Sequence, residues 1–124
     1  FYKSDGDEAG GIALAEVPGA KKNFLAFDYS NSEAIGFGMT ELKDGGHSAG
    51  ITLLDRVPLD ADIEKVGSVG TERISLTNDS GNAELTFNDV DGKPRIRLFV
   101  DKQGNARIEI KDARGNVKFT APSP

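Results

Sequence analysis

A short polar group that recurs through the C-terminal half of the chain constrains the fold more than any other feature. Asn or Asp stands three residues before Gly four times, at intervals of 11, 12 and 11 residues; the four groups begin at Asn78, Asp89, Asp101 and Asp112. An Asp or Asn side chain at the start of a turn accepts hydrogen bonds from the backbone two residues on, and Gly adopts the positive φ that closes the turn. This spacing predicts a β-meander, in which each strand pairs with the next along the chain.

The segments between the turns alternate apolar and charged residues, as strands with one apolar face do. We expect five such strands at 73–77, 84–87, 95–100, 107–111 and 117–119, and four more apolar ones at 11–15, 24–29, 35–39 and 50–54. Pairing across the Asp101 turn sets Leu98 opposite Ile108 and Arg97 opposite Glu109, so apolar residues and opposite charges both match. The other three turns need one more residue or a bulge to give the same match.

The sequence predicts a single all-β domain over residues 1–124, with a tail at 121–124. The regular spacing is interrupted only at 58–71, where a crossing loop and a short helix are both compatible with the residues. About nine antiparallel strands, each with one apolar face, must cover that face. They can close into a barrel, fold into a sandwich or pack against another subunit.

Charge and composition narrow the function. The net charge of -5 argues against a nucleic-acid partner. Residues 93–118 hold eight Lys or Arg against three Asp or Glu, a net charge of +5, whereas residues 1–92 hold seven against seventeen, a net charge of -10. A basic C-terminal face can meet an acidic partner or the acidic half of another copy, or the two halves can neutralise each other within one chain. The absence of Cys excludes disulfides and thiolate metal sites.

Candidate metal ligands are few. The densest acidic cluster contains Asp5, Asp7 and Glu8 and is the best local candidate for a cation. Turn-forming Asp and Gly residues account for the same cluster as an acidic hairpin. The later Asp-x-x-Gly groups lack the ligand spacing of a calcium loop, since Leu98 stands where a bidentate Glu would follow Gly92. We therefore expect no metal and no cofactor.

No catalytic constellation can be assembled from the sequence. His47 is the only histidine and stands beside Ser48, but neighbours in sequence do not form a dyad. Asp28 and Asp55 are candidates for an inward-facing carboxylate pair, and strand ends also carry Asp for structural reasons. We expect a protein that is not an enzyme.

Two sets of residues are candidates for binding. Phe99 falls on the charged face of its strand, so a protein partner or a second copy is expected at the strand faces around Arg95, Arg97, Phe99 and Arg107. The alternative function is a β-barrel that binds a small apolar ligand. Its cavity would be lined by Phe27, Phe37, Phe87 and Leu98.

Several segments resemble, in matching order, a family of uncharacterised bacterial proteins. The first eleven residues, FYKSDGDEAGG, are similar to that family's "FFNDEGDENGGL" type of segment, and similar segments follow at 27–29, 49–58 and 92–101. Family members typically carry an N-terminal hydrophobic segment, which implies export and membrane anchoring. The chain here starts without Met, so we expect an upstream segment that carries any such anchor. Together these features predict a non-enzymatic structural or protein-interaction module on the outer side of a bacterial membrane, such as an accessory subunit of an envelope complex.

Overall fold

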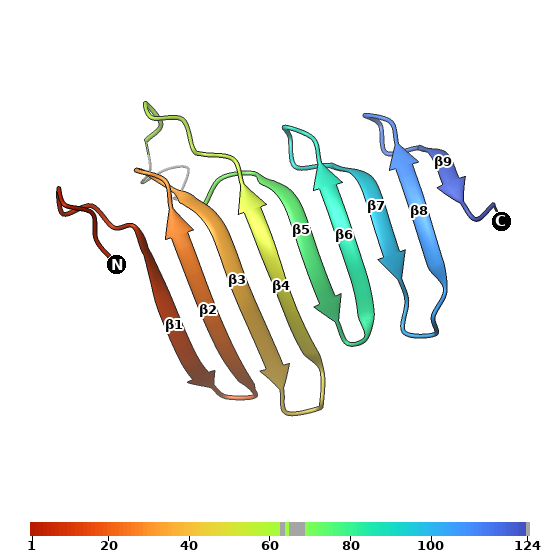
Figure 1. Cartoon of the computed structure of the whole chain (residues 1–124), viewed down its shortest axis with the longest axis horizontal. Helices are drawn as coiled ribbons and strands as arrows, with labels where there is room; N and C mark the ends of the chain where they lie inside the picture. The colour runs from red at the N-terminus through yellow and green to blue at the C-terminus, as the bar shows by residue number, and fades with distance from the viewer. Residues whose placement is uncertain (63, 65–68, 124) are drawn as a thin grey trace.

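Nine antiparallel strands form one sheet, and each strand pairs only with its neighbours in sequence (Figure 1). The computed structural model describes residues 1–62, 64 and 69–123. The strands are β1 (Gly10–Val17), β2 (Ala20–Asp28), β3 (Glu33–Leu42), β4 (His47–Leu54), β5 (Glu72–Asp79), β6 (Asn82–Asn88), β7 (Pro94–Val100), β8 (Ala106–Lys111) and β9 (Val117–Ala121). All nine expected strands are present, and the predicted up-and-down meander is confirmed. Because β9 includes Ala121, the C-terminal tail begins one residue later than predicted.

Three of the Asp-x-x-Gly groups, those at Asp89, Asp101 and Asp112, form hairpin turns of one kind. In each, the Asp backbone N–H donates to the carbonyl oxygen four residues on, and the Gly N–H donates back to the Asp carbonyl, all at 2.9–3.0 Å. The Asp Oδ1 atom accepts two further backbone N–H groups at 2.9–3.1 Å. The carboxylates therefore satisfy the turn backbone, which accounts for Asp at these positions.

The turn after Asn78 is tighter. Its loop consists of Ser80 and Gly81, whose φ angles are 50° and 91°. Two consecutive positive φ angles are typical of a type I′ turn, whose twist suits a two-residue hairpin. The register that results brings Leu76 opposite Leu85, so apolar residues meet across this turn as well.

The predicted register between β7 and β8 is also confirmed. Leu98 lies opposite Ile108, and Arg97 lies opposite Glu109. Register shifts occur near the ends of β6 and β8, at turns where the sequence required an extra residue or a bulge. A bulge resets the two-residue alternation, so apolar residues stay opposite one another across the next turn.

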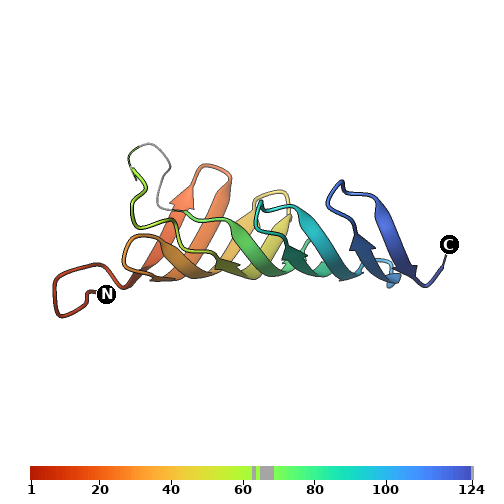
Figure 2. The same ribbon diagram turned by 90° about the horizontal axis from the view of Figure 1, so that it is seen from above.

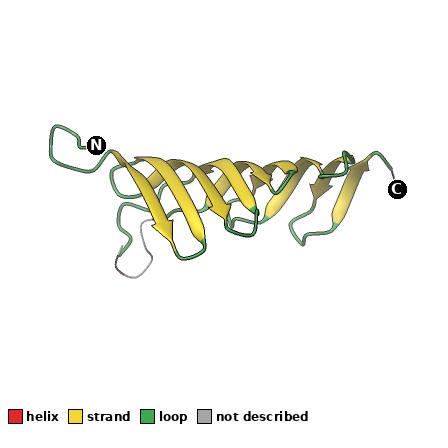
Figure 3. Ribbon diagram, turned by 90° about the horizontal axis from the view of Figure 1, so that it is seen from below, coloured by secondary structure: helices red, strands yellow, loops and turns green. Residues whose placement is uncertain are grey.

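The sheet is open and lies in a single twisted layer (Figures 2 and 3). Closure into a barrel would require β1 to pair with β9. These strands instead form the two edges of the sheet, next to β2 and β8 respectively. The barrel, one of the arrangements expected from the sequence, is therefore not formed.

Little of the chain is buried. Among the described residues, the buried apolar side chains are Ala26, Leu54 and Val57. The accessible surface is 8438 Å² for a chain of 13.2 kDa, whereas a compact folded monomer of that mass exposes about 6,400 Å². The difference of about 2,000 Å² is surface that a compact domain would cover.

The best-buried residues lie where the segment between β4 and β5 meets the turn between β2 and β3. Ser32 is 4% exposed and Val57 is 6% exposed. The Val57 N–H donates to Ser32 Oγ at 3.1 Å, and the Asn31 side chain donates to the Val57 carbonyl at 2.9 Å. These hydrogen bonds hold the start of the segment between β4 and β5 against the turn between β2 and β3. The alternative of a short helix within 58–71 falls in part on residues 63 and 65–68, which lie outside the described residues.

Candidate functional site

One face of the sheet is apolar from edge to edge. Directly paired residues point to the same face, so rows can be followed from strand to strand through the register. The first row is Ile12, Leu25, Phe37, Ile51, Leu76, Leu85, Leu98, Ile108 and Ala121. The second is Gly10, Phe27, Ile35, Leu53, Ile74, Phe87, Ile96, Ile110 and Phe119. A shorter third row is Leu14, Asn23, Met39, Ala49, Asn78, Ala83, Val100 and Ala106. We call these three rows the apolar face, and none of their members carries a charge.

The side chains of the apolar face are open to solvent. Leu14 is 75% exposed, and Leu76 and Phe119 are each 51% exposed. A shallow groove of about 740 Å³ crosses the face between Ile12 and Ala83. Monomeric soluble proteins rarely expose contiguous apolar patches beyond a few hundred Å², and larger ones mark interaction surfaces.

The residues predicted to line a ligand cavity belong to this face. Phe27 and Phe87 lie in its second row, and Phe37 and Leu98 lie in its first. They are brought to one face, as predicted, but the open sheet encloses no barrel interior for them to line. The alternative of a ligand-binding barrel is therefore wrong in its architecture. Alternation along each strand predicts the shared face, whereas closure depends on strands that are far apart in sequence.

The opposite face is divided between small and charged residues. Its central row runs through Gly11, Ala26, Gly36, Thr52, Ser75, Thr86, Arg97, Glu109 and Thr120. Over β3, the Phe24 ring takes the place of the missing side chains, since a Cβ added at Gly36 would lie 2.9 Å from that ring. Small residues thus occupy the N-terminal half of this polar face, and ion pairs occupy the C-terminal half.

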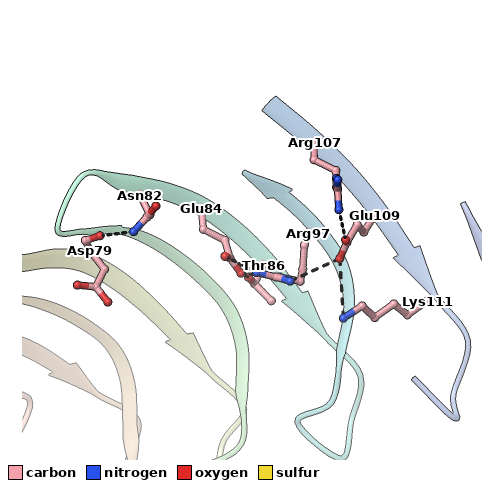
Figure 4. Close-up of polar contacts among 8 residues, drawn as sticks. All are labelled: Asp79, Asn82, Glu84, Thr86, Arg97, Arg107, Glu109 and Lys111. Carbon is pink, nitrogen blue, oxygen red and sulfur yellow. Dashed lines mark hydrogen bonds and ion pairs between the residues drawn. The ribbon is translucent and has the colours of Figure 1, made fainter. Parts of the chain in front are cut away.

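Arg97 is the centre of the ion pairs on β6, β7 and β8 (Figure 4). Its guanidinium donates two hydrogen bonds to the Glu84 carboxylate, at 2.8 and 2.7 Å, and one to Glu109 at 3.4 Å. Arg107 and Lys111 also approach the Glu109 carboxylate, at 3.7 and 3.8 Å. The hydrogen bonds from Arg97 lower the pKa of Glu84, and those to Glu84 raise the pKa of Arg97. The charges of this cluster are thus largely satisfied within the sheet.

The four residues predicted to bind a partner do share one face. Arg97 and Phe99 lie on the polar face of β7, Arg107 lies beside them on β8, and Arg95 is two residues before Arg97 on the same strand. However, Phe99 is half-buried rather than exposed, because the Arg97 guanidinium lies 4.9 Å from its ring centre. Arg95 is half-buried and donates to the Lys111 carbonyl at 2.8 Å. Among the four, Arg107 is the exposed residue, and its side chain is 50% exposed.

The acidic N-terminal segment forms a hairpin turn. The Asp7 N–H donates to Asp5 Oδ1 at 3.1 Å, and Glu8 pairs across the turn with Tyr2. A hollow of about 510 Å³ is lined by Asp7 and Glu8 of the turn and by Glu33 of β3. Burial raises the pKa of Glu33, and so does the charge of Asp28. Within the described residues, no group of three His, Asp or Glu side chains is placed to hold a metal ion. The hairpin accounts for the cluster that was the candidate cation site.

The candidate catalytic residues are not brought together. His47 and Ser48 are consecutive in β4 and therefore point to opposite faces of the sheet. The His47 ring is exposed, with Nδ1 3.2 Å from the Gly45 carbonyl oxygen. The sequence expectation that these two residues form no dyad agrees with their placement.

The proposed carboxylate pair is also separated. Asp28 lies opposite Glu33 at the end of β2, where the two strands shift in register. Asp55 follows β4 and is paired with Arg73 at 2.7 Å. Each carboxylate therefore has a different local partner.

From the sequence, another subunit is one possible cover for the apolar side of the strands, but the candidate partner contact is placed on the charged side. The signal for the apolar face was available, because the register of neighbouring strands aligns their apolar positions. Joining those positions into continuous rows required every turn length, including the ones in the less regular N-terminal half.

Comparison with protein-family models and with curated proteins finds no match to this chain. No helix in the described part of the chain has the length and apolar character needed to cross a membrane.

Proposed function

We propose that the protein is a non-enzymatic structural or protein-interaction module and that its contact surface is the apolar face. The observation that carries this proposal is the continuity of the rows, which present apolar side chains on every strand without one charge. Covering such a surface with a complementary protein surface removes apolar area from water, which is the main favourable term in association. On the polar face, by contrast, the Arg97 cluster of β6, β7 and β8 holds its charges in ion pairs within the sheet.

The polar face is the weaker candidate for the main contact. Its arginines already have carboxylate or carbonyl partners, and a partner would have to desolvate those pairs. The apolar face has no charged pairs to desolvate, and the polar side chains within its three rows are the amides of Asn23 and Asn78. Arg95, Arg97, Phe99 and Arg107 remain the candidate residues for a second contact on the polar side, where rim charges affect association rate and specificity more than affinity.

The place of action that we propose is the outer side of a bacterial membrane, in an accessory subunit of a larger envelope complex. The resemblance of residues 1–11 and of the later segments to an exported family supports this location. Protease treatment of spheroplasts that express the full gene product tests it. Degradation of the protein by protease added outside the cell is the expected result, and full protection would contradict the location.

Thiol labelling tests the contact surface. The chain has no Cys, so single substitutions introduce unique thiols. Ile108→Cys places a thiol on the apolar face and Arg107→Cys places one on the polar face of the same strand, at neighbouring positions. Maleimide labelling is measured in intact cells and again after denaturation, which corrects for intrinsic reactivity.

We expect the Ile108→Cys thiol to react in the cell about tenfold more slowly than the Arg107→Cys thiol, as expected for a position under a well-packed interface. Protection of the Arg107→Cys thiol alone would identify the polar face as the contact surface. Rapid labelling of both thiols in the cell would show that neither face is covered and would reject the function.

A further inference from the structure

The apolar face has dimensions that a second copy of the same chain can cover. We propose that the protein is a face-to-face homodimer in which the apolar faces of two chains pack against each other. This inference rests on the proposed function, because it names the partner of the same surface. The product is a β-sandwich of two nine-stranded sheets, so the second layer of the sandwich expected from the sequence comes from the other chain.

The area agrees with that of a stable dimer. Nine strands spaced about 4.8 Å apart and three rows spaced about 6.7 Å apart give a face of roughly 40 by 20 Å, or about 800 Å² per chain. Two such faces bury about 1,600 Å², which is the standard size of a specific protein interface. The accessible surface of the single chain, 8438 Å², exceeds that of a compact monomer by about 2,000 Å². One covered face per chain removes about 800 Å² of this excess.

The face is also compatible with itself. In a two-fold dimer the same patch contributes from both sides, so any charge within it would be buried against its own copy. The three rows contain no charge, and large side chains such as Leu76 and Phe37 stand 51% and 36% exposed, available to interdigitate. Two sheets pack in this way at a separation of about 10 Å. This symmetry argument applies to a second copy of the same chain and not to a partner of different sequence.

Charge selects the orientation of the two chains. Residues 1–54 hold four Lys against eight Asp or Glu, a net charge of -4, and residues 93–118 have a net charge of +5. A two-fold axis parallel to the strands places β1 of one chain over β9 of the other, so the acidic N-terminal segment faces the basic segment of the partner. β5 and β6, which belong to residues 55–92 with a net charge of -6, lie over β5 and β4 of the partner. An axis perpendicular to the strands would place β1 over β1 and like charges together. Because basic residues such as Arg97 and Arg107 lie on the outward polar face, the charges of the two chains are farther apart than the sheet separation of about 10 Å. That distance exceeds the screening length of about 8 Å at physiological ionic strength, so the preference is weak there and grows as the salt concentration is lowered.

The first experiment measures self-association of the purified protein by analytical ultracentrifugation. β5 is the central strand of the nine, so Leu76 lies near the two-fold axis and meets its own copy there. Leu76→Lys places two ammonium groups in the centre of the interface and is expected to raise the dimer dissociation constant about 100-fold or more. The control is Thr77→Lys, next on the same strand but on the polar face opposite Glu84. Both changes move the net charge from -5 towards zero, so general repulsion does not explain a loss of dimer.

The second experiment determines orientation by cross-linking. Ile12 on β1 and Ala121 on β9 belong to the same row, at opposite edges of the sheet. Within one chain, eight strand spacings separate them by about 38 Å, beyond the reach of a short bismaleimide. Ile12→Cys and Ala121→Cys proteins of different mass are mixed and treated with this reagent. We expect the mixed cross-link to dominate.

The outcomes separate the two proposals. A monomer at 100 times the cellular concentration, or an unchanged dissociation constant in Leu76→Lys with native circular dichroism, would overturn the second copy as the occupant. If the Ile108→Cys thiol is still protected in cells, the interaction function survives with another partner. Cross-links only between identical variants would overturn the orientation. Uptake of a monomer by phosphatidylcholine vesicles would identify a lipid surface instead and would also overturn the dimer. If Leu76→Lys does not fold, the cross-linking of the two cysteine variants decides the question alone.

Discussion

Removing the Arg97 guanidinium should lower the free energy of unfolding by a measurable amount. The part of this loss that comes from the pair with Glu84 can be measured separately. Arg97→Met keeps an apolar side chain of similar length but deletes the paired bonds to Glu84 at 2.8 and 2.7 Å and the contact with Glu109 at 3.4 Å. Exposed ion pairs contribute about 0.2–1 kcal/mol, and hydrogen bonds to charged groups contribute about 1.5–3 kcal/mol when well shielded. The Arg97 and Glu84 side chains are each 29% exposed, so an intermediate loss of about 1.5 kcal/mol is expected.

A double-mutant cycle isolates the pair itself. The free energy of unfolding is measured by urea denaturation for Arg97→Met, Glu84→Gln and the double variant, at one fixed protein concentration because self-association shifts apparent stability. The expected coupling is about 1 kcal/mol. The control cycle uses Arg95→Met and Asp89→Asn, whose ion pair is longer at 3.6 Å and lacks the bidentate geometry, and it should give a smaller coupling. Equal coupling in the two cycles would refute the view that the Arg97 cluster is the main polar link between β6, β7 and β8.

Two further predictions concern turns and glycines. Hydrogen bonds from Asn116 lower the pKa of Asp112 to about 2 from 3.8, so the carboxylate stabilises the folded state above pH 4 or so and this contribution is lost as the pH falls from about 4 towards about 2. Asp112→Asn should therefore have a lower urea midpoint at pH 7, with a difference that narrows below about pH 4; a constant difference across that range would contradict the assignment. Gly36→Ala should shift the NMR signals of the Phe24 ring, because the new Cβ would lie 2.9 Å from the ring and 2.8 Å from Glu33 Oε1. It should cost about 1 kcal/mol. Gly11→Ala on the same face meets only an ordinary contact at 3.6 Å and should be neutral or slightly stabilising; equal effects of the two changes would show that the ring does not pack there.

The repeated turns and the register across them were predictable because both are local properties. Asp101 with Gly104 specifies a hairpin through hydrogen bonds that span five residues, and the alternation on each side leaves one register in which Leu98 meets Ile108. The exposure of Phe99 was not predictable in the same way. It depends on the rotamer of Arg97, which two carboxylates from neighbouring strands hold in place.

The sequence by itself determined that the chain is a meander of nine strands with one apolar face, because alternation with a period of two is written in consecutive residues. Only the tertiary structure decided that this face has no cover within the described chain. Whether β1 meets β9 depends on the twist accumulated over all nine strands. This total twist cannot be read from any short stretch of neighbouring residues. The apolar rows therefore became recognisable as a surface for another molecule only when the sheet was seen to stay open.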